Sequence, residues 1–312
     1  GVFASGYLQN LDKSEQHELN VEGIIGAQKK LNDLDLSALA GVNLRKNEYS
    51  MNHLSGGPFI QRDYYSYNNL YNKFGSIGFW ESQVRSAFYS VDATYNNMFT
   101  LGTTGRWDSY STLPINNAKV FVPSVTAGFI FTELMKPGIL QFGKLRASWA
   151  NTSNELTQAY RTQIYYSLQS NNYNGIPLGT YDQALPNGLL KPFVANEIEL
   201  GTELRFFDGR LNVDLAWFTK KTKNEIMGAT LSRATGYGSG YVATGSTKNT
   251  GIELLLSGTI VKSGNFFWKS SLNMTKVKNT ILHTTEDNSN INIGQARETL
   301  GNLVTSYVVG MA

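Results

Sequence analysis

The chain has 312 residues, of which 16% are charged and 12% aromatic, with 30 glycines, 17 tyrosines, no cysteine and a formal net charge of +3. Without cysteine, disulfides and thiolate metal sites are excluded, and the lack of a basic block argues against nucleic acid as a partner. The longest apolar stretches, around 252–256 and 304–309, are far shorter than the roughly 20 residues of a membrane helix, so this chain would span a bilayer only as a β-barrel.

Alternating apolar and polar residues, the period of a β-strand, begin near the N-terminus. Two short runs predict strands around 2–8 and 19–25, and a longer run predicts a strand over 34–44. Because the first residues already alternate and show no signal peptide, we expect a mature or internal segment. A stretch crowded with Asn, Gly and Tyr follows at about 46–83 and predicts a long exposed loop.

The middle of the chain predicts a hairpin over 87–107 with a very short turn at Asn96 and Asn97. Strands around 121–131 and 145–149 follow. The Asn- and Tyr-rich segment at about 151–195 then predicts a second long loop.

Beyond it, a second hairpin alternates on both sides of Asp208 and Gly209, a pair that suits a tight turn. Its apolar face includes Ile198 and Trp217. Its other face carries five charged residues, Glu197, Glu199, Glu203, Arg205 and Asp214. A soluble sheet rarely lines one face in this way, whereas a polar lumen behind a lipid-facing wall does.

The remaining pattern predicts a loop at about 224–248, strands around 252–258 and 266–274, and a last loop at about 276–303. From the third strand onward, short turns alternate with long loops, as periplasmic turns and extracellular loops do in transmembrane barrels. This alternation of short turns with long loops holds only if residues 160–168 belong to a loop, although their apolar and polar residues also alternate to some extent. About eleven strands result, with aromatic residues near their ends. Such rings fit either membrane-interface girdles or the core of a soluble β-domain.

Six blocks follow one another in the sequence, namely residues 86–111, 121–133, 144–154, 196–223, 235–258 and 266–281. They resemble successive segments of the SusC/RagA-like TonB-dependent transporters of Bacteroidetes outer membranes. The order and spacing agree over about 86–281, and the first 80 residues match only loosely. The resemblance implies an all-β chain that forms about half of a 22-stranded barrel.

The same resemblance implies a multi-pass outer-membrane protein surrounded by lipid, with a SusD-like surface lipoprotein as its lid. A TonB complex would act through an N-terminal part ahead of a plug domain. We find no plug in this sequence and expect a fragment of a longer chain. The implied function is import of a glycan or oligopeptide. The alternative is a structural or interaction component of an outer-membrane assembly.

Further charges are expected on the polar side of the wall, where they can pair with each other or with a plug. These are Arg106 and Asp108 on one strand and Lys144 and Arg146 on another. Glu197 and Glu199 are about 7 Å apart along their strand, a separation also found in inverting glycosidases. We interpret them instead as wall charges that pair with basic residues such as Arg205 and Lys220.

No motif for catalysis, a metal or a cofactor is found, so a β-rich polysaccharide-degrading enzyme is a third and disfavoured hypothesis. His17, His53 and His283 form no metal-binding spacing, and the glycines around Tyr237 fit no phosphate or nucleophile motif. The more promising candidates are loop tyrosines, whose rings suit stacking on sugars or packing on peptides or a partner. They are Tyr64, Tyr65, Tyr67 and Tyr71 in one loop, Tyr160, Tyr165, Tyr166, Tyr173 and Tyr181 in another, and Tyr237 and Tyr241 in a third. The alternative is that these rings only pack the loops themselves.

Overall fold

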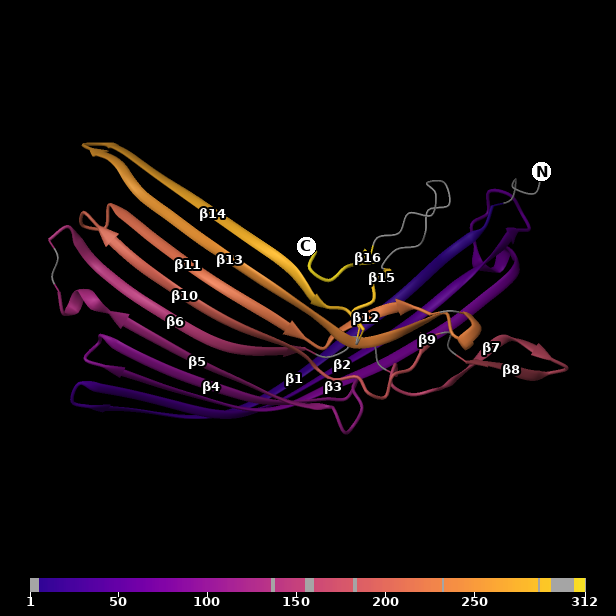
Figure 1. Ribbon diagram of the computed structural model, residues 1–312. Coiled ribbons are helices and arrows are strands. Elements are labelled where there is room, and N and C mark those ends of the chain that lie inside the picture. The colour runs from indigo at the N-terminus through magenta and orange to yellow at the C-terminus, as the bar shows by residue number, and fades with distance from the viewer. Residues whose placement is uncertain are drawn as a thin grey trace.

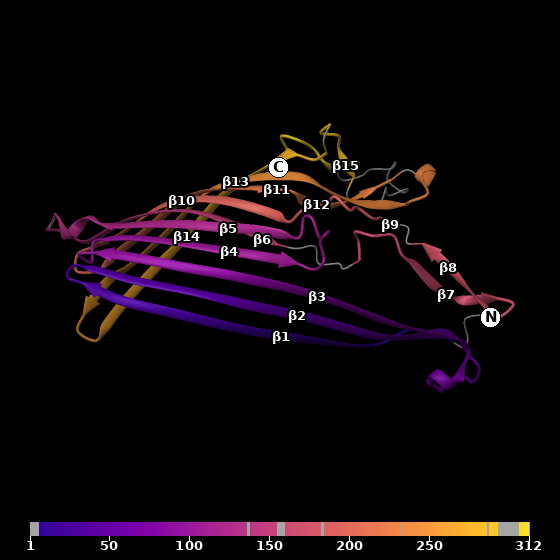
Figure 2. The ribbon, with the colours of Figure 1, turned by 90° about the horizontal axis from the view of Figure 1, so that it is seen from below.

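The computed structural model describes residues 6–135, 138–154, 160–181, 184–231, 233–285, 287–292 and 306–311. They form one 12-stranded sheet and two small two-stranded sheets, which confirms the predicted all-β class. The long strands are β1 (Leu8–Leu31), β2 (Leu34–Phe59), β3 (Leu70–Tyr95), β4 (Phe99–Tyr110), β5 (Lys119–Ile130), β6 (Leu140–Asn154), β10 (Phe193–Phe206), β11 (Leu211–Lys223), β13 (Ser239–Ser263) and β14 (Phe266–His283). After β1, each pairs antiparallel with the long strand before it, and the sheet curves into an open trough (Figures 1 and 2).

The remaining elements are short and lie in the connections. They are the strands β7 (Tyr166–Tyr173), β8 (Ile176–Tyr181), β9 (Ala184–Leu185), β12 (Glu225–Thr230), β15 (Ile291–Asn292) and β16 (Ser306–Tyr307), and the 3-10 turns η1 (Tyr67–Asn69), η2 (Phe131–Glu133) and η3 (Arg233–Thr235). Among the described residues, no helix has the length and apolar character needed to cross a membrane.

The short turns gather at one end of the sheet, on the left in Figure 1. Their residues adopt the left-handed backbone conformation that tight hairpins need, as with Asn96 and Asn97 at φ 51° and 53°. The turn predicted at Asp208 and Gly209 is present, with φ values of 56° and 76°. Longer connections leave from the opposite end. This asymmetry is the one expected of periplasmic turns and extracellular loops.

The predicted loop at 46–83 is wrong, because most of these residues form strands. β2 and β3 continue as paired strands from the turn end out to Phe59 and Leu70, so only 60–69 connects them. Strands of 26 residues are more than twice the roughly 9–11 that a membrane crossing needs. Their outer halves continue as a paired ribbon beyond the length of a crossing, and polar residues mixed with apolar ones on both faces concealed these strands from the sequence pattern.

Other predicted boundaries also change. The strand predicted around 19–25 is part of the longer β1, because the polar residues before it still pair with β2. Of the strand predicted around 2–8, Leu8 begins β1 and residues 2–5 lie outside the described ones. The loop at 151–195 contains the β7–β8 hairpin and β9, and the loop at 224–248 contains β12 paired with the start of β13. The loop at 276–303 begins later, since β14 extends to His283, and its residues 293–303 lie outside the described ones.

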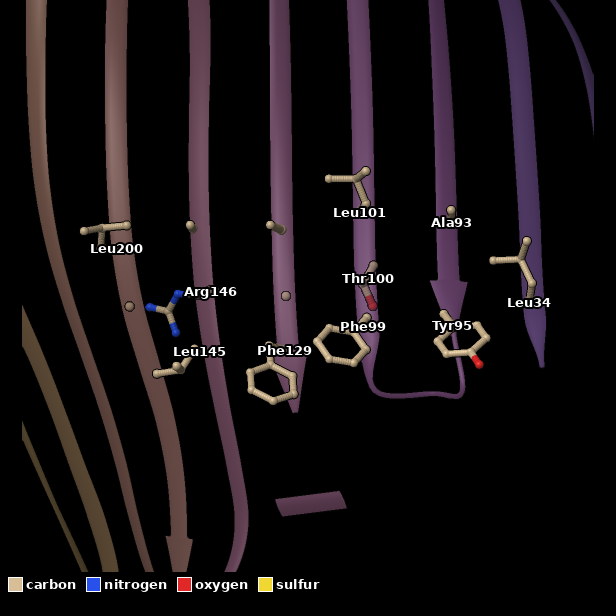
Figure 3. Close-up of a pocket in the computed structure, with 14 residues that line it drawn as sticks. Leu34, Ala93, Tyr95, Phe99, Thr100, Leu101, Phe129, Leu145, Arg146 and Leu200 are labelled. Atoms are coloured by element: carbon tan, nitrogen blue, oxygen red, sulfur yellow. The ribbon is translucent and has the colours of Figure 1, made fainter. Parts of the chain in front are cut away.

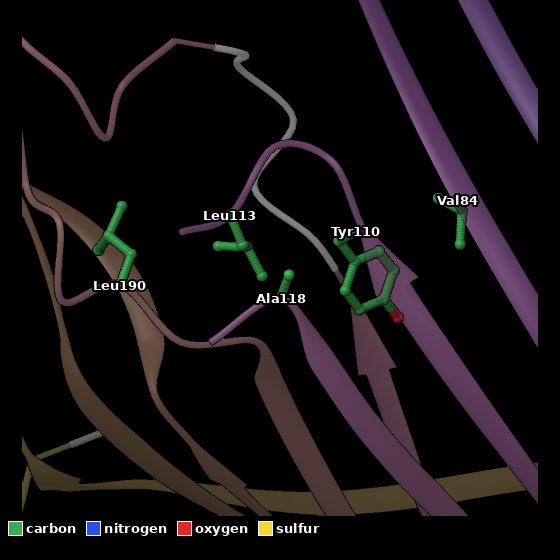
Figure 4. Packing of buried hydrophobic residues seen from close by; sticks show 5 residues of the cluster. All are labelled: Val84, Tyr110, Leu113, Ala118 and Leu190. Atoms are coloured by element: carbon green, nitrogen blue, oxygen red, sulfur yellow. The ribbon is translucent and has the colours of Figure 1, made fainter. Parts of the chain in front are cut away.

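A small apolar cluster lies at the loop end of the sheet (Figure 4). It joins Val84 of β3 and Tyr110 of β4 to Leu113, Ala118 and Leu190, with Leu190 fully buried. Cross-strand pairing places Val84 and Tyr110 on the same face of the sheet as Ser86 and Asp108. The connection after β4 and the segment before β10 are therefore packed against the polar, concave face of the wall.

Candidate functional site

The polar face of the wall carries a network of charges that crosses three neighbouring strands. Arg146 of β6 donates two hydrogen bonds to Asp214 of β11, at 3.1 and 2.8 Å, and a third to Glu199 of β10, at 3.2 Å. All three side chains are partly exposed. The arginine therefore connects strands that are not direct neighbours, because β10 lies between β6 and β11.

Glycine at position 201 makes this crossing possible. In the register of the sheet, Arg146 lies opposite Gly201 of β10. A Cβ atom on Gly201 would lie 2.6 Å from Nε of Arg146, closer than such atoms approach. The guanidinium thus passes over bare backbone on its way to Asp214. A glycine inside a strand commonly marks such a close approach.

The other carboxylates of β10 also have basic partners. Glu203 accepts hydrogen bonds from Arg205 at 2.6 and 3.1 Å, and the register places Lys144 of β6 directly opposite it. Glu197 forms an ion pair of 3.7 Å with Lys220. Arg205 also lies over the ring of Phe142, with its guanidinium carbon 4.6 Å from the ring centroid. Each carboxylate of β10 thus lies beside a basic side chain, and no unpaired acid and base stand together on this strand.

A second charged group lies on β3 and β4. Asp108, only 8% exposed, accepts hydrogen bonds from Arg106 at 2.7 Å and from the hydroxyl of Ser86 at 2.5 Å. Arg106 also donates to Ser86 at 2.7 Å and lies over the ring of Phe88. A buried carboxylate is tolerated when charge-assisted hydrogen bonds satisfy it, as here.

The candidate tyrosines fall into separate groups. Tyr64, Tyr65 and Tyr71 are exposed around the connection between β2 and β3, where Tyr65 also meets the edge of the Phe59 ring. Tyr67 lies in the 3-10 turn of the same connection. Tyr166 and Tyr173 lie at the two ends of β7 and are 75% and 68% exposed.

A third group brings two of the predicted loops together. Tyr165 and Tyr237 line one very small, partly open cavity of about 10 Å³, together with Tyr160, Arg161, Gln163, Ile164, Tyr181, Ala184 and Pro186. Tyr181 meets the edge of Tyr237 at 5.6 Å, and its hydroxyl donates to the carbonyl of Gly236 at 3.0 Å. Arg161 lies over Tyr241. We call Tyr165, Tyr181, Tyr237, Tyr241 and Arg161 the loop aromatic cluster.

One aromatic pair was missed because its segment was predicted to be a loop. Tyr49 of β2 and Trp80 of β3 lie opposite each other and stack at 5.4 Å. They share the face that farther along the strands carries Ser86. On the opposite face of this ribbon, Lys46 contacts Glu48 at 2.6 Å and Glu81 at 2.9 Å, and hydrogen bonds to these carboxylates raise the pKa of Lys46 above its usual value. Period-two alternation through 46–59 was the available signal.

Comparisons with known proteins agree with this geometry. A family model described as TonB dependent receptor-like, beta-barrel matches residues 4–310. TonB-dependent receptor P26 of Formosa agariphila is 30% identical over 260 residues, which are 79% of this chain and 26% of that protein. TonB-dependent receptor P3 of the same organism is 26% identical over 293 residues, which are 90% of this chain and 27% of that protein. The chain thus spans about a quarter of the length of these relatives.

Two solved structures show the same fold. The RagAB peptide importer in its "closed-closed" state superposes with a TM-score of 0.81 and 17% identity, over 97% of this chain and 33% of that chain. The siderophore receptor PirA from Acinetobacter baumannii superposes with a TM-score of 0.55 and 15% identity, over 89% of this chain and 38% of that chain. The curved sheet is therefore a portion of a larger barrel wall.

Proposed function

This chain belongs to the TonB-dependent receptor-like β-barrel family, and from that membership we propose that it forms part of an importer for a glycan or oligopeptide. The membership confirms the predicted resemblance and places the chain in the outer membrane as a multi-pass β-barrel. We further propose that it acts with a SusD-like surface lipoprotein as its lid and with a TonB complex as its source of energy. The family consists of receptors and transporters rather than enzymes.

The observation that carries the proposal is the internally compensated charge network on the concave face. Arg146 contacts both Glu199 and Asp214, so the described part of this face is polar and its charges pair with one another. Such a surface suits a lumen through which a polar solute or a plug domain moves. The barrel does no covalent chemistry in this scheme, and transport depends on different affinities in different conformations.

The loop aromatic cluster supplies the proposed contact with substrate or lid. It joins the segment before β10 to the start of β13 at the loop end of the sheet. The exposed rings Tyr64, Tyr65, Tyr71, Tyr166 and Tyr173 are candidates for the same role, and so is Tyr67. Amphipathic rings of this kind bind sugars and peptides with little loss of conformational entropy.

The proposal is tested by deleting the full-length gene and measuring growth on single glycan and peptide sources. Import predicts loss of growth on one source, restored by the gene and not by a version lacking the TonB-contacting segment. Growth and uptake unchanged across the whole panel would contradict it. Copurification of a surface lipoprotein from a detergent extract tests the lid. If the lipoprotein copurifies while uptake is unaffected, the alternative of an assembly component is favoured.

A further inference from the structure

The three strands at the N-terminal edge of the sheet, β1, β2 and β3, extend well beyond their neighbours at the loop end (Figure 2). β4 ends at Tyr110, opposite Val84 of β3, whereas β3 itself begins at Leu70. Trp80 lies about 15 residues from Tyr95 at the short turn, which is about 50 Å along the strand and roughly 40 Å along the barrel axis. The apolar band of such barrels is about 25 Å tall, so Trp80 lies outside the membrane on the extracellular side.

The concave face of this extension carries two aromatic rings in line with an amide. The register places Gln16 of β1 opposite Tyr49 of β2, and Tyr49 opposite Trp80 of β3. Tyr49 and Trp80 stack with their ring centroids 5.4 Å apart and their planes at 25°, and both side chains are partly exposed. Trp80 shares the concave face because it alternates in phase with Ser86, which donates a hydrogen bond to Asp108 of the wall.

Small and polar residues border the two rings on the same face. The next row toward the membrane consists of Glu18, Asn47 and Ser82. On the other side of Trp80 along β3, Gly78 has no side chain, and the nearest atom to a Cβ there would belong to Met51, at 3.9 Å. This arrangement leaves space for a ring of another molecule beside Trp80.

The two faces of the extension differ in charge. The outward face carries Lys46 in contact with both Glu48 and Glu81. By contrast, the two concave rows contain one charged side chain, Glu18, among two rings, two amides and a hydroxyl. Flat rings suit the C–H groups of a pyranose, and amides and hydroxyls suit its O–H groups. The scarcity of charge favours a neutral sugar over an oligopeptide, whose free termini are charged.

We propose that this surface binds a neutral oligosaccharide, with Tyr49 and Trp80 as the substrate platform at the extracellular mouth of the barrel. The inference rests on the proposed function, because it names the substrate class of that importer. One pyranose lies on Trp80 and over Gly78, and the chain continues across Tyr49 to Gln16. Two strand spacings separate Trp80 from Gln16, about 10 Å, which is the scale of two linked sugar rings.

Titration of the purified full-length receptor tests this inference. The probes are hexasaccharides of glucose, mannose, xylose and galactose, and a defined pool of hexapeptides represents the competing class. We expect a hexasaccharide to bind, Trp80→Ala to weaken its affinity about tenfold, and Trp80→Phe, which keeps a ring, to weaken it much less. The matched control is Phe79→Ala, which removes the adjacent ring from the outward face, where it is 60% exposed, and should leave the affinity unchanged.

A folding check and a second variant keep the test decisive. Unheated and heated electrophoretic mobilities report whether each barrel is folded. If Trp80→Ala does not fold, Gln16→Ala replaces it, and we expect a severalfold weaker affinity from the loss of one hydrogen bond. Its control is His17→Ala, the next residue of β1, which lies opposite Glu48 on the outward face.

The outcomes separate this inference from the proposed function. Equal affinity in the folded platform variant and its control would overturn the inference, and so would a lack of binding by every hexasaccharide, whether or not hexapeptides bind. Hexasaccharide binding that depends on Trp80, without any growth defect on deletion of the gene, would support the platform and contradict import. A growth defect confined to peptide sources would support import and overturn the platform.

Discussion

Arg146 of β6 reaches across the whole width of β10 to bind Asp214 of β11 with two hydrogen bonds of 3.1 and 2.8 Å. The register places Gly201 beneath the guanidinium, so no side chain of β10 stands between Arg146 and Asp214. The pair thus ties together three strands through one side chain, and its removal should affect barrel stability rather than one hairpin alone.

Replacing Gly201 with alanine should loosen this contact. The new Cβ would lie 2.6 Å from Nε of Arg146, so the guanidinium must shift away from Asp214. We expect a loss of about 1 kcal/mol in the free energy of unfolding, since the partners are partly exposed and screened by solvent. Urea unfolding of the full-length receptor measures it. Gly228→Ala is the control, because nothing lies within 4 Å of its Cβ position, and an equal loss there would contradict the prediction.

The coupling between Arg146 and Asp214 is measurable by a double-mutant cycle. Arg146→Met and Asp214→Asn should each destabilise the barrel, and the double variant should lose less than the sum. We expect a coupling energy of about 1 kcal/mol, reduced by high salt. Additive effects would mean that the two hydrogen bonds make no net contribution in the hydrated lumen.

Neutralising Asp108 should cost more than neutralising an exposed aspartate. Asp108 is 8% exposed and accepts from Arg106 and Ser86, so Asp108→Asn removes a charge-assisted hydrogen bond and leaves a buried amide that matches these donors less well. We expect a loss of about 1–2 kcal/mol, since the side chain of Arg106 is 41% exposed and water partly replaces its partner. The matched control, Asp63→Asn, changes a side chain that is 77% exposed and should be neutral in the same urea titration. Similar midpoints for both variants would refute the assignment.

Neighbouring leucines provide a test of the apolar cluster at the loop end. Leu190 is fully buried, whereas Leu189 is 80% exposed. Leu190→Ala should cost about 2–4 kcal/mol locally, because it creates a cavity between the wall and the packed connections. Hydrogen exchange around 186–192 should rise in Leu190→Ala and stay unchanged in Leu189→Ala. Equal exchange in the two variants would show that the cluster does not hold this segment.

The loop aromatic cluster can be tested for a role in uptake. Tyr237→Ala removes a ring that contacts Tyr181 and lines the cavity, and one such ring contributes about 1 kcal/mol or more to an aromatic contact. We expect a severalfold lower apparent affinity for the growth-supporting substrate, measured by its concentration dependence of uptake. Tyr237→Phe, which keeps the ring, is the control. Unchanged uptake in Tyr237→Ala would leave the cluster a packing element of the loops.

The sequence predicted a strand and its two faces wherever only one of the faces is apolar. Alternation around Asp208 and Gly209 predicted the β10–β11 hairpin, because only a strand puts Ile198 and Leu200 on one side and Glu197 and Glu199 on the other. The same signal was weak in the ribbon formed by the outer halves of β2 and β3. There both faces mix polar and apolar side chains, with Ile77 on one face and Trp80 on the other, so alternation separates a strand from a loop less clearly.

Sequence by itself determined the fold class, the turn chemistry and the family, since period two, Asn and Gly at tight turns and blocks in fixed order are local features. Only the tertiary structure decided which charges meet. Arg146 and Asp214 are 68 residues apart, and their contact depends on the sheet register and on the lack of a side chain at Gly201. The hollow over Ala127 of β5 and Ala147 of β6 on the outward face (Figure 3) likewise exists only because the register places these two small residues side by side. The register between strands, rather than the residue pattern along one strand, determines which of these side chains meet.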